Sequence, residues 1–149
     1  MDQSARLAWE KDFENEGLRD RVRKVDADNT VFLKKLIAEY GWPKISIVGK
    51  DVALEAWYIA QHTPDKDFLK ECLKLMQQNP NEVEAFNLAR TIDRIRLGDG
   101  LPQYYGTHFI QSSDGKWVPQ PIEDEDNVDE RRAKIGQPSM EEKLKEYNG

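Results

Sequence analysis

The sequence predicts a mainly α protein: an irregular bundle of about six helices with one small β-hairpin in its C-terminal third. Apolar residues recur at helical spacing through most of the chain, between glycine and proline breaks. The period changes once, where two β-prone runs, THFIQ and KWVP, flank the turn sequence SSDG. A two-stranded hairpin is unstable alone, so we expect it to pack on the helices.

The composition limits the classes of function. A chain of 149 residues is the usual size of one domain, so we expect a single domain over residues 1–149. A net charge of −6 without a basic run argues against a nucleic-acid partner. The chain shows no bilayer-length apolar stretch and no signal-peptide pattern, so we expect a cytoplasmic protein with no membrane partner. The oligomeric state stays open.

The first half predicts helices joined by short breaks. We expect residues 1–25 to form an N-terminal cover helix, broken or kinked near Gly17. A second helix begins near Asp28, a capping candidate, and ends at Gly41. The β-prone run Ile45–Val48 could be a strand, but a connector is favoured.

The later helices carry clearer signals. We expect them at residues 51–62, 65–78, 81–97, 129–134 and 139–147. Cys72, the single cysteine, lies on an apolar helical face and is interpreted as core packing. Ser139 and Glu142 form a capping-box pattern at the start of the last helix. The acidic run EDEDNVDE at 123–130 is interpreted as a solvated loop, because it lacks the glycine turn and regular alternation of a calcium loop.

Residues 86–109 concentrate polar groups where the apolar pattern predicts burial or a cleft. Asp93 and Arg94 lie late in a helix that glycines then break, and the polar segment QYYGTH follows. Asp93 could instead pair with neighbouring arginines in a solvated ladder. His62 ends another helix, where the helix dipole favours the imidazolium; it either caps the final carbonyls or serves a cleft.

The chain resembles a bacterial family catalogued only as a domain of unknown function. The resemblance covers roughly residues 26–147 and rests on ordered blocks: GWP at 41–43, VG at 48–49, AWYIAQH at 56–62, DR at 93–94, QYYGTHF at 103–109, PIED at 121–124 and DERRAKIG at 129–136. It implies signature positions at His62, Asp93, Arg94, Tyr105, Gly106, Thr107, Arg131 and Arg132. His108 stands where that family more often has glutamine, which argues against a catalytic role for His108. The resemblance implies a shared site without naming its ligand.

These residues predict a polar pocket for a small polar or anionic ligand, with His62 as acid or base and Asp93 orienting its ring. The predicted ligand-binding residues are Arg94, Gln103, Tyr105, Gly106, Thr107, Glu123, Asp124, Arg131 and Arg132. Phosphate-loop, dinucleotide and HExxH motifs are missing, so no cofactor and no metal are predicted. A zinc site from His62, His108 and a carboxylate is a minor alternative. Whether the chain is an enzyme stays open.

Two other classes of function fit the same sequence. A non-enzymatic interaction module would use exposed aromatic residues, for which the candidates are Trp9, Trp42, Tyr104, Tyr105 and Trp117. In a third reading, the polar set only joins the hairpin and the C-terminal segment to the helices by buried charge pairs.

Overall fold

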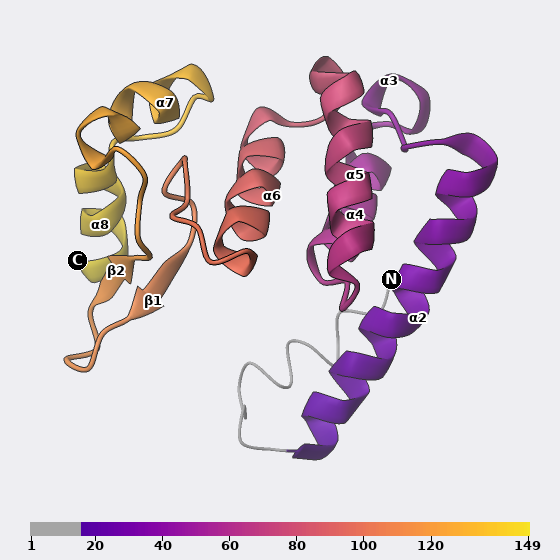
Figure 1. Cartoon of the computed structure of the whole chain (residues 1–149), viewed down its shortest axis with the longest axis horizontal. Helices are drawn as coiled ribbons and strands as arrows, with labels where there is room; N and C mark the ends of the chain where they lie inside the picture. Colours follow the sequence, from indigo (N-terminus) through magenta and orange to yellow (C-terminus); the bar gives the residue numbers. More distant parts are fainter. Residues whose placement is uncertain (1–15) are drawn as a thin grey trace. The chain divides into compact units, whose positions relative to one another are not determined.

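The computed structural model describes residues 16–149, and Trp9 and most of the predicted cover helix lie outside them. The chain divides into two compact units, Met1–Leu75 and Met76–Gly149, called unit 1 and unit 2 below. The described residues form seven α-helices and one antiparallel hairpin, which confirms the predicted mainly α class (Figure 1). None of the helices in residues 16–149 is long and apolar enough to cross a membrane.

Unit 1 is built from helices that pack through apolar side chains. Its elements are α2 (Glu16–Tyr40), α3 (Ile45–Val48), α4 (Lys50–Gln61) and the first part of α5 (Lys66–Gln78). Both α2 and α3 pack on α4 (Figure 1). Leu33, Trp57 and Ala60 are buried, and so is Cys72, as predicted. Burial raises the pKa of the Cys72 thiol to about 12, as expected for a thiol that packs as a small hydrophobe.

The predicted break between the first two helices is wrong, because α2 runs continuously from Glu16 to Tyr40. Asp28 does not cap a new helix; its carboxylate accepts a hydrogen bond from Lys24 Nζ at 2.8 Å, one turn earlier on the same helix. The buried residues of α2, Val22, Thr30 and Leu33, lie on one helical face across the expected break. A continuous buried face thus outweighed the local capping signal.

The link at Ile45–Val48 was predicted as an extended connector, and this prediction is also wrong. The segment forms the short helix α3, in which the Lys44 carbonyl accepts hydrogen bonds from the Ile47 and Val48 amides at 3.0 and 2.9 Å. A β-branched composition is a weak preference that packing often overrides, and here α3 packs on α4.

Side-chain hydrogen bonds join the turn after α4 to the middle of α2. The hydroxyl oxygens of Thr30 and Thr63 lie 2.9 Å apart and share a hydrogen bond. Lys34 Nζ lies 2.6 Å from Asp65 Oδ2, and the other Asp65 oxygen caps α5 by accepting from the Phe68 amide. These polar contacts therefore hold the middle of α2 against the C-terminal end of α4.

Unit 2 combines short helices with long irregular connections. Its elements are η1 (Pro80–Glu82), α6 (Ala85–Gly98), β1 (Phe109–Gln111), β2 (Trp117–Pro119), η2 (Glu125–Asn127), α7 (Val128–Lys134) and α8 (Met140–Asn148). The helix predicted from residue 81 begins later, at Ala85, because η1 is a separate 3₁₀ turn. The predicted hairpin is confirmed, with Phe109 opposite Pro119.

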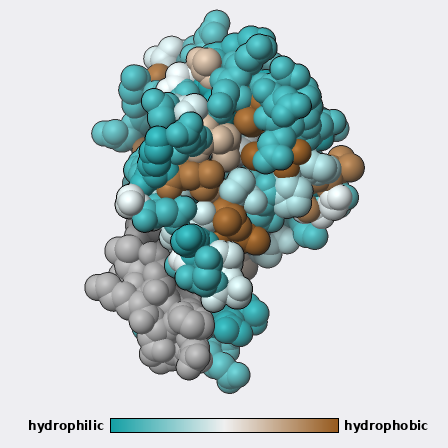
Figure 2. Space-filling model, turned by 90° about the vertical axis from the view of Figure 1, so that its left-hand side faces the viewer, coloured by the Kyte–Doolittle hydropathy of each residue, from teal (hydrophilic) through white to brown (hydrophobic). Residues whose placement is uncertain are grey.

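The hairpin packs on α8, as its instability in isolation requires. Asn148 accepts a hydrogen bond from the Trp117 amide and donates one to the Trp117 carbonyl, while the Tyr147 ring contacts the rings of Phe109 and Trp117. The capping box predicted at Ser139 is present. In Figure 2, the side that lies at the left of Figure 1 faces the viewer. Hydrophilic residues cover most of it, and hydrophobic residues occur in small groups.

Candidate functional site

The predicted site residues fall into two units. His62 is the C-cap of α4 in unit 1. The others all lie in unit 2: Asp93, Arg94, Gln103, Tyr105, Gly106, Thr107, Glu123, Asp124, Arg131 and Arg132. Convergence of His62 with Asp93 therefore stays a prediction, and the geometry of the remaining residues is described within unit 2.

Asp93 organises the loop that follows α6. Its side chain is fully buried. One carboxylate oxygen accepts hydrogen bonds from the amides of Tyr104 and Tyr105 at 2.7 and 2.9 Å. The other accepts from the Thr107 amide at 3.1 Å and from the Thr107 hydroxyl at 2.9 Å. A buried carboxylate needs such compensation, and here the chain itself supplies the donors.

Two buried arginines hold the same loop through its carbonyls. Arg131 Nε donates to the Tyr104 carbonyl at 2.7 Å, and its guanidinium lies 4.4 Å from the centre of the Tyr104 ring. Arg132 Nη1 donates to the carbonyls of Tyr105 and Gly106 at 3.0 and 2.9 Å. The 103–108 loop is thus bound on its amides by a carboxylate and on its carbonyls by two guanidinium groups.

Each arginine also joins this loop to a more distant segment. Arg131 Nη2 donates to the carbonyls of Glu123 and Asp124, and Arg132 Nε donates to the Pro138 carbonyl at 2.6 Å. These donors serve backbone acceptors, whereas the third reading of the sequence expected buried charge pairs. A guanidinium suits this role because its donors diverge in a fixed plane.

Gln103 fastens the loop to the segment after the hairpin. Its buried amide donates to the carbonyls of His108 and Gln120, each at 2.9 Å, and accepts from the His108 amide. Its backbone forms an isolated parallel bridge with Ile122. Gln103 was predicted to bind a ligand. In the structure its side chain bonds to backbone groups of His108 and Gln120, as backbone groups of paired strands bond to each other.

Gly106 lies where the loop approaches α8 most closely. Its φ of +63° is in the left-handed region, which glycine adopts without a steric penalty. A Cβ at this position would lie 2.7 Å from Met140 Sδ and 3.3 Å from Ile122 Cδ1. The backbone at Gly106 therefore lies close to the protein's own side chains.

The remaining predicted residues of unit 2 are less enclosed. Glu123 is exposed and pairs with Arg96 at 2.6 Å. Asp124 has a left-handed backbone, and its carboxylate accepts from the Asn127 amide. Arg94 and Tyr105 are half-buried, and burial is the main cause that raises the pKa of Tyr105. Within residues 16–149 no group of three His, Cys, Asp or Glu side chains is placed to hold a metal ion.

His108 is the one histidine of unit 2, and its imidazole is partly buried. The single hydroxyl hydrogen of Thr107 is donated to Asp93, so the 2.9 Å contact between Thr107 Oγ1 and His108 Nδ1 requires the hydrogen on Nδ1. The pKa of His108 is lowered to about 4, mainly by burial; the charges of Arg90 and Arg94 contribute to the lowering, and Asp93 opposes it. The imidazole is therefore neutral at pH 7, with Nε2 as a hydrogen-bond acceptor.

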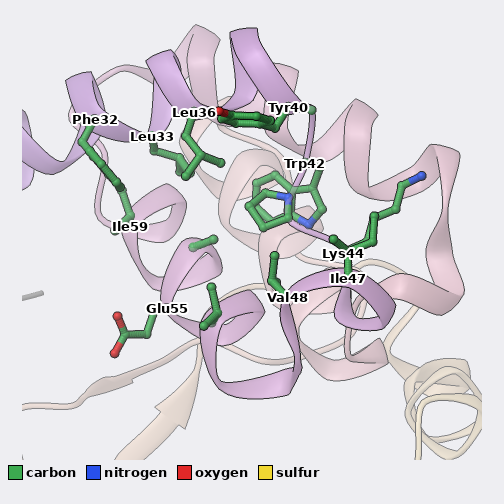
Figure 3. Close-up of a pocket in the computed structure, with 14 residues that line it drawn as sticks. Phe32, Leu33, Leu36, Tyr40, Trp42, Lys44, Ile47, Val48, Glu55 and Ile59 are labelled. Carbon is green, nitrogen blue, oxygen red and sulfur yellow. The ribbon is translucent and has the colours of Figure 1, made fainter.

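Sequence reasoning did not predict the pocket in unit 1, which has a volume of about 340 Å³ and lies between α2, α3 and α4 (Figure 3). Its floor includes the buried residues Leu33, Trp42 and Ala56. Four large apolar side chains on its lining are exposed: Phe32 (60%), Tyr40 (76%), Ile47 (75%) and Val52 (55%). The signal available in the sequence was the apolar stripe of α2 followed directly by GWP, which ends the helix beside its own apolar face.

Charged groups occur only at the edges of this pocket. Lys44 and Glu55 are the two charged residues of its lining. Figure 3 places them at opposite ends of the pocket, with the ammonium and the carboxylate directed away from the cavity. The interior is therefore apolar, and it is suited to apolar groups rather than to the polar ligand that the sequence predicted in unit 2.

Comparison with known proteins gives one match. A family model described as "Family of unknown function (DUF6624)" matches residues 2–148. No curated protein matches the chain. No solved structure matches it either.

Proposed function

The chain belongs to DUF6624, a family of unknown function, so we propose its role from its own geometry: unit 1 is a protein-interaction module that takes apolar side chains of a protein partner into the pocket between α2, α3 and α4. One observation carries this proposal, namely an open apolar pocket bordered by four exposed large hydrophobic residues. The proposal is the interaction module that the sequence left open as an alternative, although Trp42, which was expected there as an exposed aromatic residue, is buried in the pocket lining.

The exposed apolar area favours a protein partner. The side chains of Phe32, Tyr40, Ile47 and Val52 together expose on the order of 500 Å², which is in the range of the largest apolar patch on a monomer and is often functional. A small molecule inside the cavity would leave much of this rim in water. A protein surface would fill the pocket and also cover the rim.

The polar cluster of unit 2 supports the same choice. Asp93 accepts hydrogen bonds from four donor groups of the 103–108 loop, and Arg131 and Arg132 donate to backbone carbonyls. These groups already satisfy one another, and replacing their partners with a ligand would leave buried backbone groups unpaired. An open binding surface with unused apolar area is found in unit 1.

Capture of the neutral dye Nile red tests the pocket directly. We expect enhanced, saturable fluorescence with wild type at sub-micromolar protein, and loss of this signal in Val52→Glu. Val31→Glu is the matched control, because Val31 is 53% exposed against 55% for Val52 and does not line the pocket. Equal dye binding by the two variants would refute the proposal.

A second measurement separates a protein partner from a small apolar ligand. Decanoate, a medium-chain fatty acid, combines an apolar tail with a carboxylate that Lys44 could bind. Under the proposal, decanoate raises the melting temperature only at millimolar concentrations, if at all. A saturable rise at micromolar concentrations, absent in Val52→Glu, would identify the pocket as a small-molecule site instead.

A second candidate function is the binding of a small anion in unit 2, at His108 rather than at His62, the histidine that the sequence favoured. The observation that favours it is the hydrogen-bond chain from Asp93 through Thr107 to His108, which orients a neutral imidazole close to Arg90 and Arg94. An anion bound there would favour the imidazolium, with His108 as proton acceptor and Asp93 as a positioning residue. Titration of the His108 ring by NMR with and without phosphate tests this: a pKa unchanged by phosphate excludes an anion at this imidazole.

A further inference from the structure

We propose that the occupant of the unit 1 pocket is a second copy of this chain, so that the protein forms a symmetric dimer through the face made by α2, α3 and α4. The inference rests on the proposed function, since it names the partner of the same pocket. It is carried by two properties of the face, its combination of cavity and protruding side chains and the placement of its two charges.

The face carries both halves of an apolar contact. Tyr40 and Ile47 are about three-quarters exposed and border a cavity of about 340 Å³. In an isologous interface the same patch occurs on both sides, so protruding residues of each copy must enter the cavity of the other. A patch with a cavity at its centre and large apolar side chains on its rim meets that requirement.

The charges on the face are self-complementary. Lys44 and Glu55 lie at opposite ends of the pocket (Figure 3). A two-fold axis in the plane of the interface, running across the line between them, brings Lys44 of one copy opposite Glu55 of the other. The same operation pairs the remaining two charges, so the charged residues of the two pocket linings form two opposite-charge contacts.

The size of the face sets the expected affinity. An apolar patch on the order of 500 Å² is smaller than the ~800 Å² per partner of a standard stable interface. We therefore expect dissociation in the micromolar range. Each copy carries a net charge of −6, which opposes association at low ionic strength, so the measurement belongs at physiological salt, where the Debye length is about 8 Å.

Sedimentation velocity over a concentration series of the full chain tests the dimer. Wild type should shift from monomer to dimer with rising concentration. Phe32→Glu should stay monomeric, whereas Val31→Glu, with the same change at the adjacent exposed position of α2, should dimerise like wild type. Wild type that stays monomeric into the high micromolar range, or equal behaviour of the two variants, would overturn the proposal.

Charge reversal tests the two-fold arrangement itself. Lys44→Glu alone places glutamate opposite Glu55, and Glu55→Lys alone places lysine opposite Lys44, so each variant should dimerise roughly tenfold or more weakly than wild type. A mixture of the two variants restores both opposite-charge contacts in a heterodimer. We expect the mixture to associate like wild type, and a mixture as weak as its components overturns the geometry.

The dye and the dimer measurements separate the two proposals. If wild type captures Nile red through Val52 but stays monomeric, the second copy is the wrong partner and the interaction pocket stands. If dye capture also fails at protein concentrations where the monomer dominates, both proposals fail. Dimerisation that survives Phe32→Glu places the self-contact on another face and overturns this inference.

Discussion

Unit 1 and unit 2 bury different kinds of side chain. Unit 1 packs helices through apolar residues such as Leu33, Trp57 and Ala60, and leaves an apolar pocket open to solvent. Unit 2 buries Asp93 and Arg132 almost completely and uses them to hold a loop. Where the chain is irregular, buried charged side chains can pair the backbone groups that a helix or sheet would otherwise pair. An exposed apolar surface, in contrast, is not used in packing and is available for binding.

The reason lies in the backbone. Helices satisfy their own amides and carbonyls, so the side chains of unit 1 are left to pack. The 103–108 loop has no such ladder, and its amides and carbonyls are paired instead with Asp93, Arg131 and Arg132. If this contrast is right, conservative changes of charged groups should be costly in unit 2, and apolar-to-charged changes on the pocket rim of unit 1 should be cheap.

The largest effect is expected for Asp93→Asn. The amide keeps one acceptor oxygen and places N–H donors against the backbone amides of the loop, so we expect a loss of ~3–5 kcal/mol in the free energy of unfolding. Urea denaturation, with NMR of the Tyr104 and Thr107 amides, measures it. Asp126→Asn, at an exposed position, is the control. If Asp93→Asn is as stable as wild type, the contrast between the two units is wrong and Asp93 is available for a functional role.

Arg132→Lys should cost about 2–3 kcal/mol. Its three acceptors are the carbonyls of Tyr105, Gly106 and Pro138, and a single ammonium group cannot reach all of them in the guanidinium plane. Thermal and urea unfolding give the value. Arg23→Lys on the surface of α2 in unit 1 should stay within about 0.5 kcal/mol. Equal costs for the two changes would remove the distinction between the units.

The pH dependence of stability should report His108. Its pKa is lowered to about 4 in the folded chain, so the unfolded chain takes up the proton first as pH falls. The contribution of the neutral His108 ring to the free energy of unfolding is complete above pH ~6.5 and is lost as pH falls toward 4. After discounting for partial exposure, this contribution is on the order of 2 kcal/mol.

A difference measurement isolates this histidine from the carboxylates. His108→Asn keeps a donor to Thr107 without a titrating ring, so the wild-type loss of stability from about pH 6.5 to 4 should exceed that of the variant. Unfolding free energies at several pH values provide the two curves. Parallel curves would show that the imidazole does not differ between the folded and unfolded chains.

Gly106→Ala should cost about 1–2 kcal/mol through backbone strain and the contact with Met140 Sδ. Gly100→Ala separates the two causes, because Gly100 has a φ of +77° but open space around its Cβ position. We expect the smaller loss for Gly100→Ala. Met140→Ala should reduce the additional cost at Gly106 in a double-mutant cycle of unfolding free energies. Identical losses at the two glycines would assign the whole effect to backbone strain.

The smallest effect is expected for Val52→Glu in unit 1. The side chain is more than half exposed, so the unfolding free energy should change by no more than about 0.5 kcal/mol although binding to the pocket is lost. Unfolding curves measured below the dimer concentration range provide the test. A loss above about 2 kcal/mol would mean that the rim supports the fold rather than a partner.

The fold class and several individual elements follow from local sequence. The mainly α class, the hairpin around the SSDG turn, the buried Cys72 and the capping box at Ser139 depend on spacing and local chemistry that short segments contain. The same local signals were misleading at Asp28 and at Ile45–Val48, where packing on α4 outweighs capping and β propensity.

How the polar residues and the apolar faces are used depends on tertiary packing. The sequence marked Asp93 and Arg132 as unusual, but their hydrogen bonds go to a loop eleven to twenty-seven positions away, and periodicity does not reveal such partners. Phe32, Leu33 and Tyr40 recur at helical spacing in α2, yet the fold buries Leu33 while it exposes Phe32 and Tyr40. Helical spacing states which side chains share a face; what covers that face depends on how the helices pack, which is a property of the folded chain.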